Sequence, residues 1–204
     1  MLPAHDLLSA FFAGQLPAVC ARADGRIHLP TSLPTVLLPG SFNPLHAAHV
    51  GLARVAAELL GTPAAFELAV VNADKPPLPM EEVRRRLAQF AWLAPLWLTR
   101  VPTFREKAVL FPGATFVVGA DTAARIVHHR FYENSVARMN DALACVRGQG
   151  CRFLVAGRVD ASGHFLGRDD LPLPVAARDL FDAVPAERFR LDLSSTQLRA
   201  VAPG

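Results

Sequence analysis

The chain contains few cysteines and no pattern that would pair them. It has only three, Cys20, Cys145 and Cys151, an odd number without CxxC or zinc-finger spacing. This set argues against a disulfide framework and against a zinc-finger module. It fits reduced thiols, so we expect a cytoplasmic location.

Long hydrophobic runs are also missing. The longest uncharged apolar stretch covers residues 87–99 and is broken by Pro95, so it is too short to form a membrane helix. The N-terminal residues MLPAHDLLSAFF have no basic region ahead of their apolar residues, which argues against a secretory signal. We therefore expect no association with a membrane.

A strong basic charge is absent as well. The formal net charge is +3, and the one dense basic cluster, Arg84-Arg85-Arg86, lies inside an apolar helical pattern. A surface for nucleic acid needs more lysines and arginines, so we expect no nucleic-acid partner. The triplet instead favours a solvated helix face with one arginine turned inward.

Several short catalytic motifs are missing too. The sequence contains no G-x-G-x-x-G, no Walker P-loop, no H-E-x-x-H and no G-x-S-x-G. The sequence therefore gives no support for the glycine-rich dinucleotide-binding motif. It also gives none for a P-loop enzyme, a zinc protease or a serine hydrolase. No set of metal ligands is expected in the protein.

What the chain does have is a regular alternation of short apolar strands and helical patterns. Its 204 residues, 51% of them apolar, suffice for one globular domain with a sizeable core. We expect that domain over residues 34–204, and an N-terminal extension, residues 1–33, packed on it as a helix and a hairpin. Helices are expected at 4–13, 46–60, 81–93, 120–127, 135–147 and 176–183, and strands at 35–38, 66–71, 97–101, 114–118 and 153–156.

This alternation predicts an α/β fold with a Rossmann-like, doubly wound parallel sheet in three layers, α/β/α. In such sheets, ligands bind beyond the carboxyl ends of the strands. The unusual loops all follow expected strands: GSFNPLH after 35–38, NADK after 66–71, GAD after 114–118, and SST near the C-terminus. We therefore expect these loops to form one site.

The loop GSFNPLH carries most of the chemical information. Gly40 allows close approach of backbone N–H groups to a ligand, and Ser41 adds a hydroxyl. The expected helix then presents free N–H donors and a partial positive charge, which favour an anion. His46 and His49 are three residues apart, so both rings can share one face at that helix end. Two imidazoles there suit phosphate oxygens.

These residues resemble the GxFxPxHxxH signature of the nucleotidyltransferase superfamily. The matching positions are Gly40, Phe42, Pro44, His46 and His49. Ala48 departs from the usual glycine and would crowd a bound triphosphate by one methyl group. A second family signature, ISSTxxR, is similar to residues 193–199, LSSTQLR. The resemblance implies that Gly40, Ser41, Phe42, Ser194, Ser195 and Thr196 bind the nucleotide, and that His46, His49 and Arg199 are catalytic.

Further segments resemble the nicotinamide and nicotinate mononucleotide adenylyltransferases. FVVGAD, residues 116–121, is similar to a family segment whose glycine and aspartate contact the adenine nucleotide, which implies this role for Gly119 and Asp121. Lys75, Arg86 and Trp97 are similar to residues that bind the second substrate, although Gln89 and Phe90 depart from the pattern around Arg86. As an alternative, Asp121 caps a helix and Trp97 belongs to the core.

The resemblance implies transfer of AMP from ATP to a mononucleotide, with release of pyrophosphate. Magnesium would be carried by the substrate phosphates, and the partners would be small nucleotides. Two alternatives stay open: another phosphorylated acceptor or CTP, and a nucleotide-binding relative with weak or no transferase activity. Homo-oligomerisation also stays open.

The resemblance leaves residues 1–33 unexplained. Relatives continue well past the SSTxxR segment, whereas here five residues follow Arg199. Our hypothesis is that the N-terminal helix and hairpin cover the surface that a C-terminal helix covers in those relatives.

Overall fold

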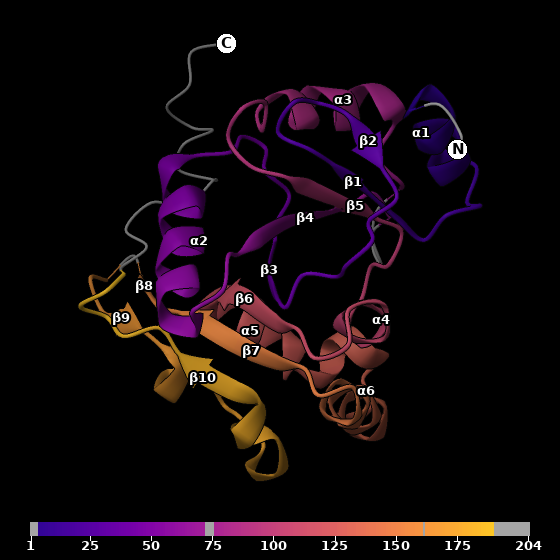
Figure 1. Ribbon diagram of the computed structural model, residues 1–204. Coiled ribbons are helices and arrows are strands. Elements are labelled where there is room, and N and C mark those ends of the chain that lie inside the picture. The colour runs from indigo at the N-terminus through magenta and orange to yellow at the C-terminus, as the bar shows by residue number, and fades with distance from the viewer. Residues whose placement is uncertain (1–3, 72–75, 161, 190–204) are drawn as a thin grey trace.

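The computed structural model describes residues 4–71, 76–160 and 162–189. It contains an eight-stranded sheet in the order β10-β7-β6-β3-β4-β5-β1-β2, with helices on both faces (Figure 1). A separate two-stranded hairpin is formed by β8 and β9. The strands are β1 Ala18–Ala21, β2 Ile27–His28, β3 Val36–Pro39, β4 Ala65–Ala69, β5 Leu96–Thr99, β6 Thr115–Gly119, β7 Arg152–Ala156, β8 Arg158–Val159, β9 Phe165–Leu166 and β10 Phe181–Ala183.

Six α-helices and three short 3₁₀ helices connect these strands in the described part of the chain. They are α1 Ala4–Phe12, α2 Ala47–Leu60, α3 Met80–Ala88, α4 Phe104–Leu110, α5 Ala120–Ile126 and α6 Val136–Gly148, with η1 His129–Tyr132, η2 Arg168–Asp170 and η3 Val175–Leu180. The helix α2 ends at Gly61, which adopts the left-handed conformation that terminates many helices.

The six strands from β10 to β5 run parallel to one another. Starting at β3, the chain adds β4 and β5 on one side, then crosses to add β6, β7 and β10 on the other. The direction of winding therefore reverses between β3 and β6. This reversal confirms the predicted doubly wound, Rossmann-like sheet and marks the point where such sheets bind ligands.

The helices form two layers because side chains of each strand alternate between the two faces of the sheet. Leu38 and Phe66 pack with residues of α1, α2 and α3. Leu37 and Phe116 pack on the other face with residues of α4, α5 and α6. The predicted three-layer arrangement is confirmed.

The N-terminal segment extends the sheet. The strand β1 pairs antiparallel with β5, and β2 pairs antiparallel with β1, so the predicted hairpin is confirmed. Phe11 of α1 is fully buried. The Trp92 N–H donates to the Ala23 carbonyl at 2.7 Å, which joins the hairpin turn to the loop before β5.

Two expected helix features differ from the structure. The helix α3 ends at Ala88 rather than near Leu93, because residues 89–93 form turns and Trp92 has a φ of 60°, which an α-helix cannot contain. The helix expected at 46–60 begins at Ala47, because the backbone of the N-cap residue His46 is extended.

Several elements were not predicted from the sequence, among them α4, β10 and the β8–β9 hairpin. The helix α4 was not predicted, although Thr103 and Glu106 form a capping box at its start. The helix expected at 176–183 is a 3₁₀ helix, η3, followed by β10. Residues 181–183 are extended because they pair with β7.

The expected arginine arrangement in α3 is confirmed, since Arg84 and Arg85 are exposed and Arg86 is buried. No helix among the described residues is both long and apolar enough to cross a membrane.

Candidate active site

The two histidines meet at the N-terminus of α2. His46 is the N-cap residue, with an extended backbone, and His49 lies in the first turn. Their rings are stacked, with centroids 3.8 Å apart and an interplanar angle of 28°. The His46 backbone N–H donates to Nδ1 of His49 at 3.3 Å. Both rings therefore lie at the N-terminal end of a helix that follows the central strand.

The surroundings favour uncharged histidines. Burial, followed by the proximity of His46, lowers the pKa of His49 from 6.5 to about 4. Burial also lowers the pKa of His46. Since Nδ1 of His49 accepts a hydrogen bond, the neutral ring carries its proton on Nε2. At neutral pH, Nε2 of His49 is thus a hydrogen-bond donor.

The loop between β3 and α2 is shaped by Gly40 and Phe42. Phe42 is fully buried, with a φ of 47°, and its ring makes edge contacts with Phe66, Phe90 and His49 at centroid distances of 5.1–5.6 Å. A Cβ on Gly40 would lie 2.6 Å from this ring. The ring of Phe42 thus fixes the loop and contacts His49. Phe42 was predicted to bind the nucleotide, but its buried ring is not available to a ligand.

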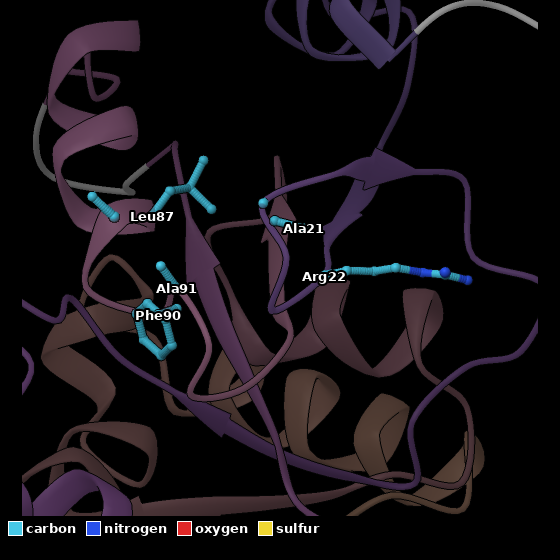
Figure 2. Close-up of a pocket in the computed structure, with 7 residues that line it drawn as sticks. Ala21, Arg22, Leu87, Phe90 and Ala91 are labelled. Atoms are coloured by element: carbon cyan, nitrogen blue, oxygen red, sulfur yellow. The ribbon is translucent and has the colours of Figure 1, made fainter.

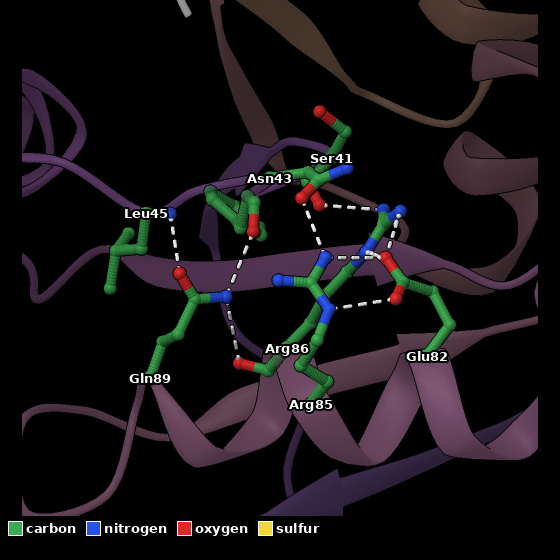
Figure 3. A network of polar contacts seen from close by, with 8 residues as sticks. Ser41, Asn43, Leu45, Glu82, Arg85, Arg86 and Gln89 are labelled. Carbon is green, nitrogen blue, oxygen red and sulfur yellow. Dashed lines mark hydrogen bonds and ion pairs between the residues drawn. The ribbon is translucent and has the colours of Figure 1, made fainter. Parts of the chain in front are cut away.

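Arg86 of α3 and Gln89, the C-cap residue of this helix, hold the same loop from the side (Figure 3). Gln89 accepts from the Leu45 N–H at 2.8 Å and donates to the Phe42 carbonyl at 3.0 Å. Arg86 donates to the Ser41 carbonyl at 2.8 Å and to Glu82 at 2.7 Å. We call Arg86 and Gln89 the α3 clamp.

Arg85 adds a contact outside the clamp. It bonds Asn43 Oδ1 at 2.6 Å and both carboxylate oxygens of Glu82. Hydrogen bonds from Arg85 and then Arg86 lower the pKa of Glu82 to about 2. The carboxylate therefore stays charged and keeps both guanidinium groups in place.

The structure places Arg86, a predicted acceptor-binding residue, mainly in a supporting position. Its side chain is buried, and Glu82 and the Ser41 carbonyl occupy donors of its guanidinium. Arg86 nevertheless lines the pocket described next.

A pocket of about 220 Å³ opens beside the histidine loop. It extends from Gly40 and Ser41, across the end of β4, to α4 and α5. Buried in its wall is an ion pair in which Lys107 Nζ donates to Glu67 Oε1 at 2.5 Å. Thr99 Oγ1 donates to the same oxygen. The lining residues are Pro39, Gly40, Ser41, Glu67, Leu68, Ala69, Leu78, Arg86, Phe104, Lys107 and Thr122.

The segment predicted to contact the adenine nucleotide covers the end of β6 and the start of α5, at the winding reversal. Gly119 is the N-cap of α5, and Asp121 lies in its first turn. Asp121 is exposed and pairs with Arg158 at 2.9 Å. Both residues thus lie at the same sheet edge as the histidines, next to the pocket residue Thr122.

Trp97 does not lie at this edge. Its ring is 5% exposed and packs against Phe111 in an edge contact at 5.2 Å. The structure therefore places Trp97 in the core, which was the alternative to a role in binding the second substrate.

The remaining predicted site residues, Lys75, Ser194, Ser195, Thr196 and Arg199, lie outside the described residues. Within residues 4–71, 76–160 and 162–189, no three His, Cys, Asp or Glu side chains are grouped to hold a metal ion.

The sequence reading missed Glu67, Thr99, Lys107 and Gln89. A signal for Glu67 was present, since it is an acid in the middle of the apolar strand AFELA. Gln89 entered the sequence analysis only as a departure from the family pattern. In the structure, its side chain bonds both the Leu45 N–H and the Phe42 carbonyl of the histidine loop.

A second pocket, of about 120 Å³, lies between the hairpin and the end of α3 (Figure 2). Its wall includes Ala21, which pairs with Leu96 at the start of β5. It therefore lies at the amino ends of the parallel strands, away from the loops described above, and its lining is mostly apolar.

A family model described as cytidylyltransferase-like matches residues 37–201, which includes both histidines and the LSSTQLR segment. No curated protein matches the chain.

Proposed function

The chain belongs to the cytidylyltransferase-like family, a group within the nucleotidyltransferases, and from this premise we propose that it transfers AMP from ATP to a mononucleotide. The acceptor would be nicotinamide or nicotinate mononucleotide. The observation that carries the proposal is the stacked His46–His49 pair at the N-terminus of α2, directly beside a pocket.

The reaction would be an in-line displacement at the α-phosphorus of ATP. An oxygen of the acceptor's phosphate forms the new bond, and the bond from the α-phosphorus to the oxygen bridging it to the β-phosphate breaks, so pyrophosphate leaves. Such a transfer needs positioning and charge neutralisation more than covalent help from the protein.

The histidines would supply both. The Nε2–H of His49 would donate to an oxygen of the triphosphate, aided by the partial positive charge at the N-terminus of α2. Since the pKa of His49 is low in the free protein, the ring binds as a neutral donor and gains charge only where phosphate oxygens raise its pKa.

The other groups of the proposal follow the family resemblance. Ser194, Ser195, Thr196 and Arg199 would bind the β- and γ-phosphates, and Lys75 the phosphate of the acceptor. Gly119 and Asp121 would contact the adenine nucleotide. Magnesium would enter with the triphosphate as part of the substrate.

The decisive experiment measures pyrophosphate release with ATP or CTP and a panel of phosphorylated acceptors. We expect release with ATP that depends on a pyridine mononucleotide. His49→Ala should lower turnover at least about a hundredfold, because it removes a donor aimed at developing charge. Arg84→Ala, an exposed change on α3, is the matched control and should keep full turnover.

Ala48 supports a second candidate, a nucleotide-binding relative with little transferase activity. It stands in the first turn of α2, where the family has glycine, between the two histidines. ATP binding without acceptor-dependent pyrophosphate would favour this candidate, and Ala48→Gly should then increase turnover. Undiminished release in His49→Ala would contradict the role of the histidine in either case.

A further inference from the structure

The pocket beside the histidine loop contains a buried carboxylate that the proposed reaction does not use. Glu67 is 1% exposed, in the middle of β4. Lys107 and Thr99 both donate to its Oε1, whereas Oε2 is buried and has no hydrogen-bond partner among the described residues. An acceptor oxygen in this state costs free energy unless a ligand supplies a donor.

The charge of this group limits what the ligand can be. Lys107 is 4% exposed and lies 2.5 Å from Oε1, so it balances the carboxylate and the pair is neutral overall. The unused position is therefore a hydrogen-bond acceptor next to an already compensated charge. Oε2 can accept a hydrogen bond from a neutral N–H or O–H group of a ligand. A ligand carboxylate is disfavoured, because two charged acceptor oxygens would then face each other without a shared proton.

The position of the pocket assigns it to the acceptor. Gly119 and Asp121 lie after β6, on one side of the histidine loop, where the adenine nucleotide is proposed to bind. Glu67 lies on the other side, in β4. The lining residues Leu68, Ala69 and Leu78 lie on that side as well, whereas Thr122 is the one lining residue that follows β6. The volume of about 220 Å³ is below the roughly 300–1,000 Å³ of sites for drug-sized ligands, so it suits one substituted ring and not a whole mononucleotide.

We propose that Glu67 Oε2 accepts a hydrogen bond from the carboxamide N–H of the acceptor's pyridine ring. Glu67 is then the residue that favours nicotinamide over nicotinate mononucleotide. The inference rests on the proposed function, since it takes the acceptor to be a pyridine mononucleotide.

The test compares the binding of the two mononucleotides by titration calorimetry, with pyrophosphate release measured in parallel. The wild-type protein should bind the nicotinamide form at least about tenfold more tightly than the nicotinate form. Glu67→Gln should reduce this ratio to near one, because a neutral amide at this position can donate to a carboxylate as well as accept from an amide.

Two variants keep the result interpretable. Glu67→Gln leaves Lys107 buried without its counter-charge, so the double variant Glu67→Gln/Lys107→Gln removes both charges and should show the same loss of selectivity. Thr99→Val removes a hydrogen bond to Oε1 but keeps the carboxylate, and should keep the wild-type preference. Circular dichroism and thermal melts confirm that each variant is folded.

The outcomes separate the two proposals. Selective binding without pyrophosphate release would support Glu67 and contradict the transferase proposal. Transfer with an unchanged ratio in the folded double variant would overturn the role of Glu67. A wild-type preference for nicotinate would also overturn it, and so would binding of neither mononucleotide.

Discussion

Gly40 is the residue on which the position of the histidine loop depends most directly. Its N–H donates to the Glu67 carbonyl at 2.9 Å, and the ring of Phe42 lies against its Cα. Phe42 in turn contacts His49. The glycine is therefore needed for close packing, since its place admits no side chain while Phe42 stays buried.

We predict that Gly40→Ala destabilises the protein by about 1–3 kcal/mol, because the added methyl would overlap the buried Phe42 ring. Urea unfolding measures this change. Gly148→Ala is the matched control, since nothing lies within 4 Å of its added Cβ, and it should be neutral or slightly stabilising at the end of α6. Equal effects of the two substitutions would contradict the packing argument.

The lowered pKa of His49 makes a prediction about pH and stability. The unfolded chain has a histidine pKa near 6.5, and the folded chain has one of about 4, so between these values the unfolded state binds more protons. Stability from this residue is therefore complete above pH 6.5 and is lost as the pH falls toward 4.

The free energy of unfolding should fall by about 1 kcal/mol more in wild type than in His49→Gln between pH 7 and pH 5. This value is discounted for the partial exposure of the ring. Denaturant unfolding at the two pH values checks it. An identical pH dependence in the two proteins would show that the burial of His49 does not perturb its titration.

At the scale of the element, α3 determines where the histidine loop lies. Gln89 bonds both the Leu45 N–H and the Phe42 carbonyl, and Arg86 bonds the Ser41 carbonyl. The α3 clamp therefore contacts the loop at three successive points before α2 begins. Side chains far away in sequence thus supply the hydrogen bonds that regular secondary structure would otherwise give to the backbone of this loop.

Gln89→Ala should lower stability by about 1–2 kcal/mol, because the partly buried Leu45 N–H and Phe42 carbonyl lose their partner. It should also lower turnover by displacing the histidines. Gln89→Glu distinguishes the two bonds, since it can still accept from Leu45 but cannot donate to Phe42. If Gln89→Ala has wild-type stability and turnover, the clamp does not position the loop.

The N-terminal extension can be tested as a unit. It adds β1 along the whole of β5, and without it the strand Leu96–Thr99 would become an open sheet edge. Deleting residues 1–30 should therefore lower both the melting temperature and the solubility. If neither changes, the extension does not cover a surface that needs protection.

At the scale of the whole molecule, the sequence predicted the fold better than it predicted the site. The alternation of strands and helices was visible locally, and so was the loop after each strand. The helix α4 was missed because its seven residues are too few for a clear helical period, although its capping box was readable.

The site was predictable only where its residues are adjacent in sequence. His46 and His49 are three apart and belong to one helix end, so their stacking follows from the motif. Lys107 and Glu67 are 40 residues apart and meet only because α4 packs over β4. The pairing cannot be inferred from one sequence, because the acid in the apolar strand is visible locally but nothing near Lys107 marks it as the partner.

The lengths of the outermost strands have a consequence for self-association. One edge of the sheet is β10, with three residues, and the other is β2, with two. An incoming strand would find few free backbone donors and acceptors at either edge. The sheet is thus a poor template for growth, and copies of this chain that associate should meet through their helical faces rather than by continuing the sheet.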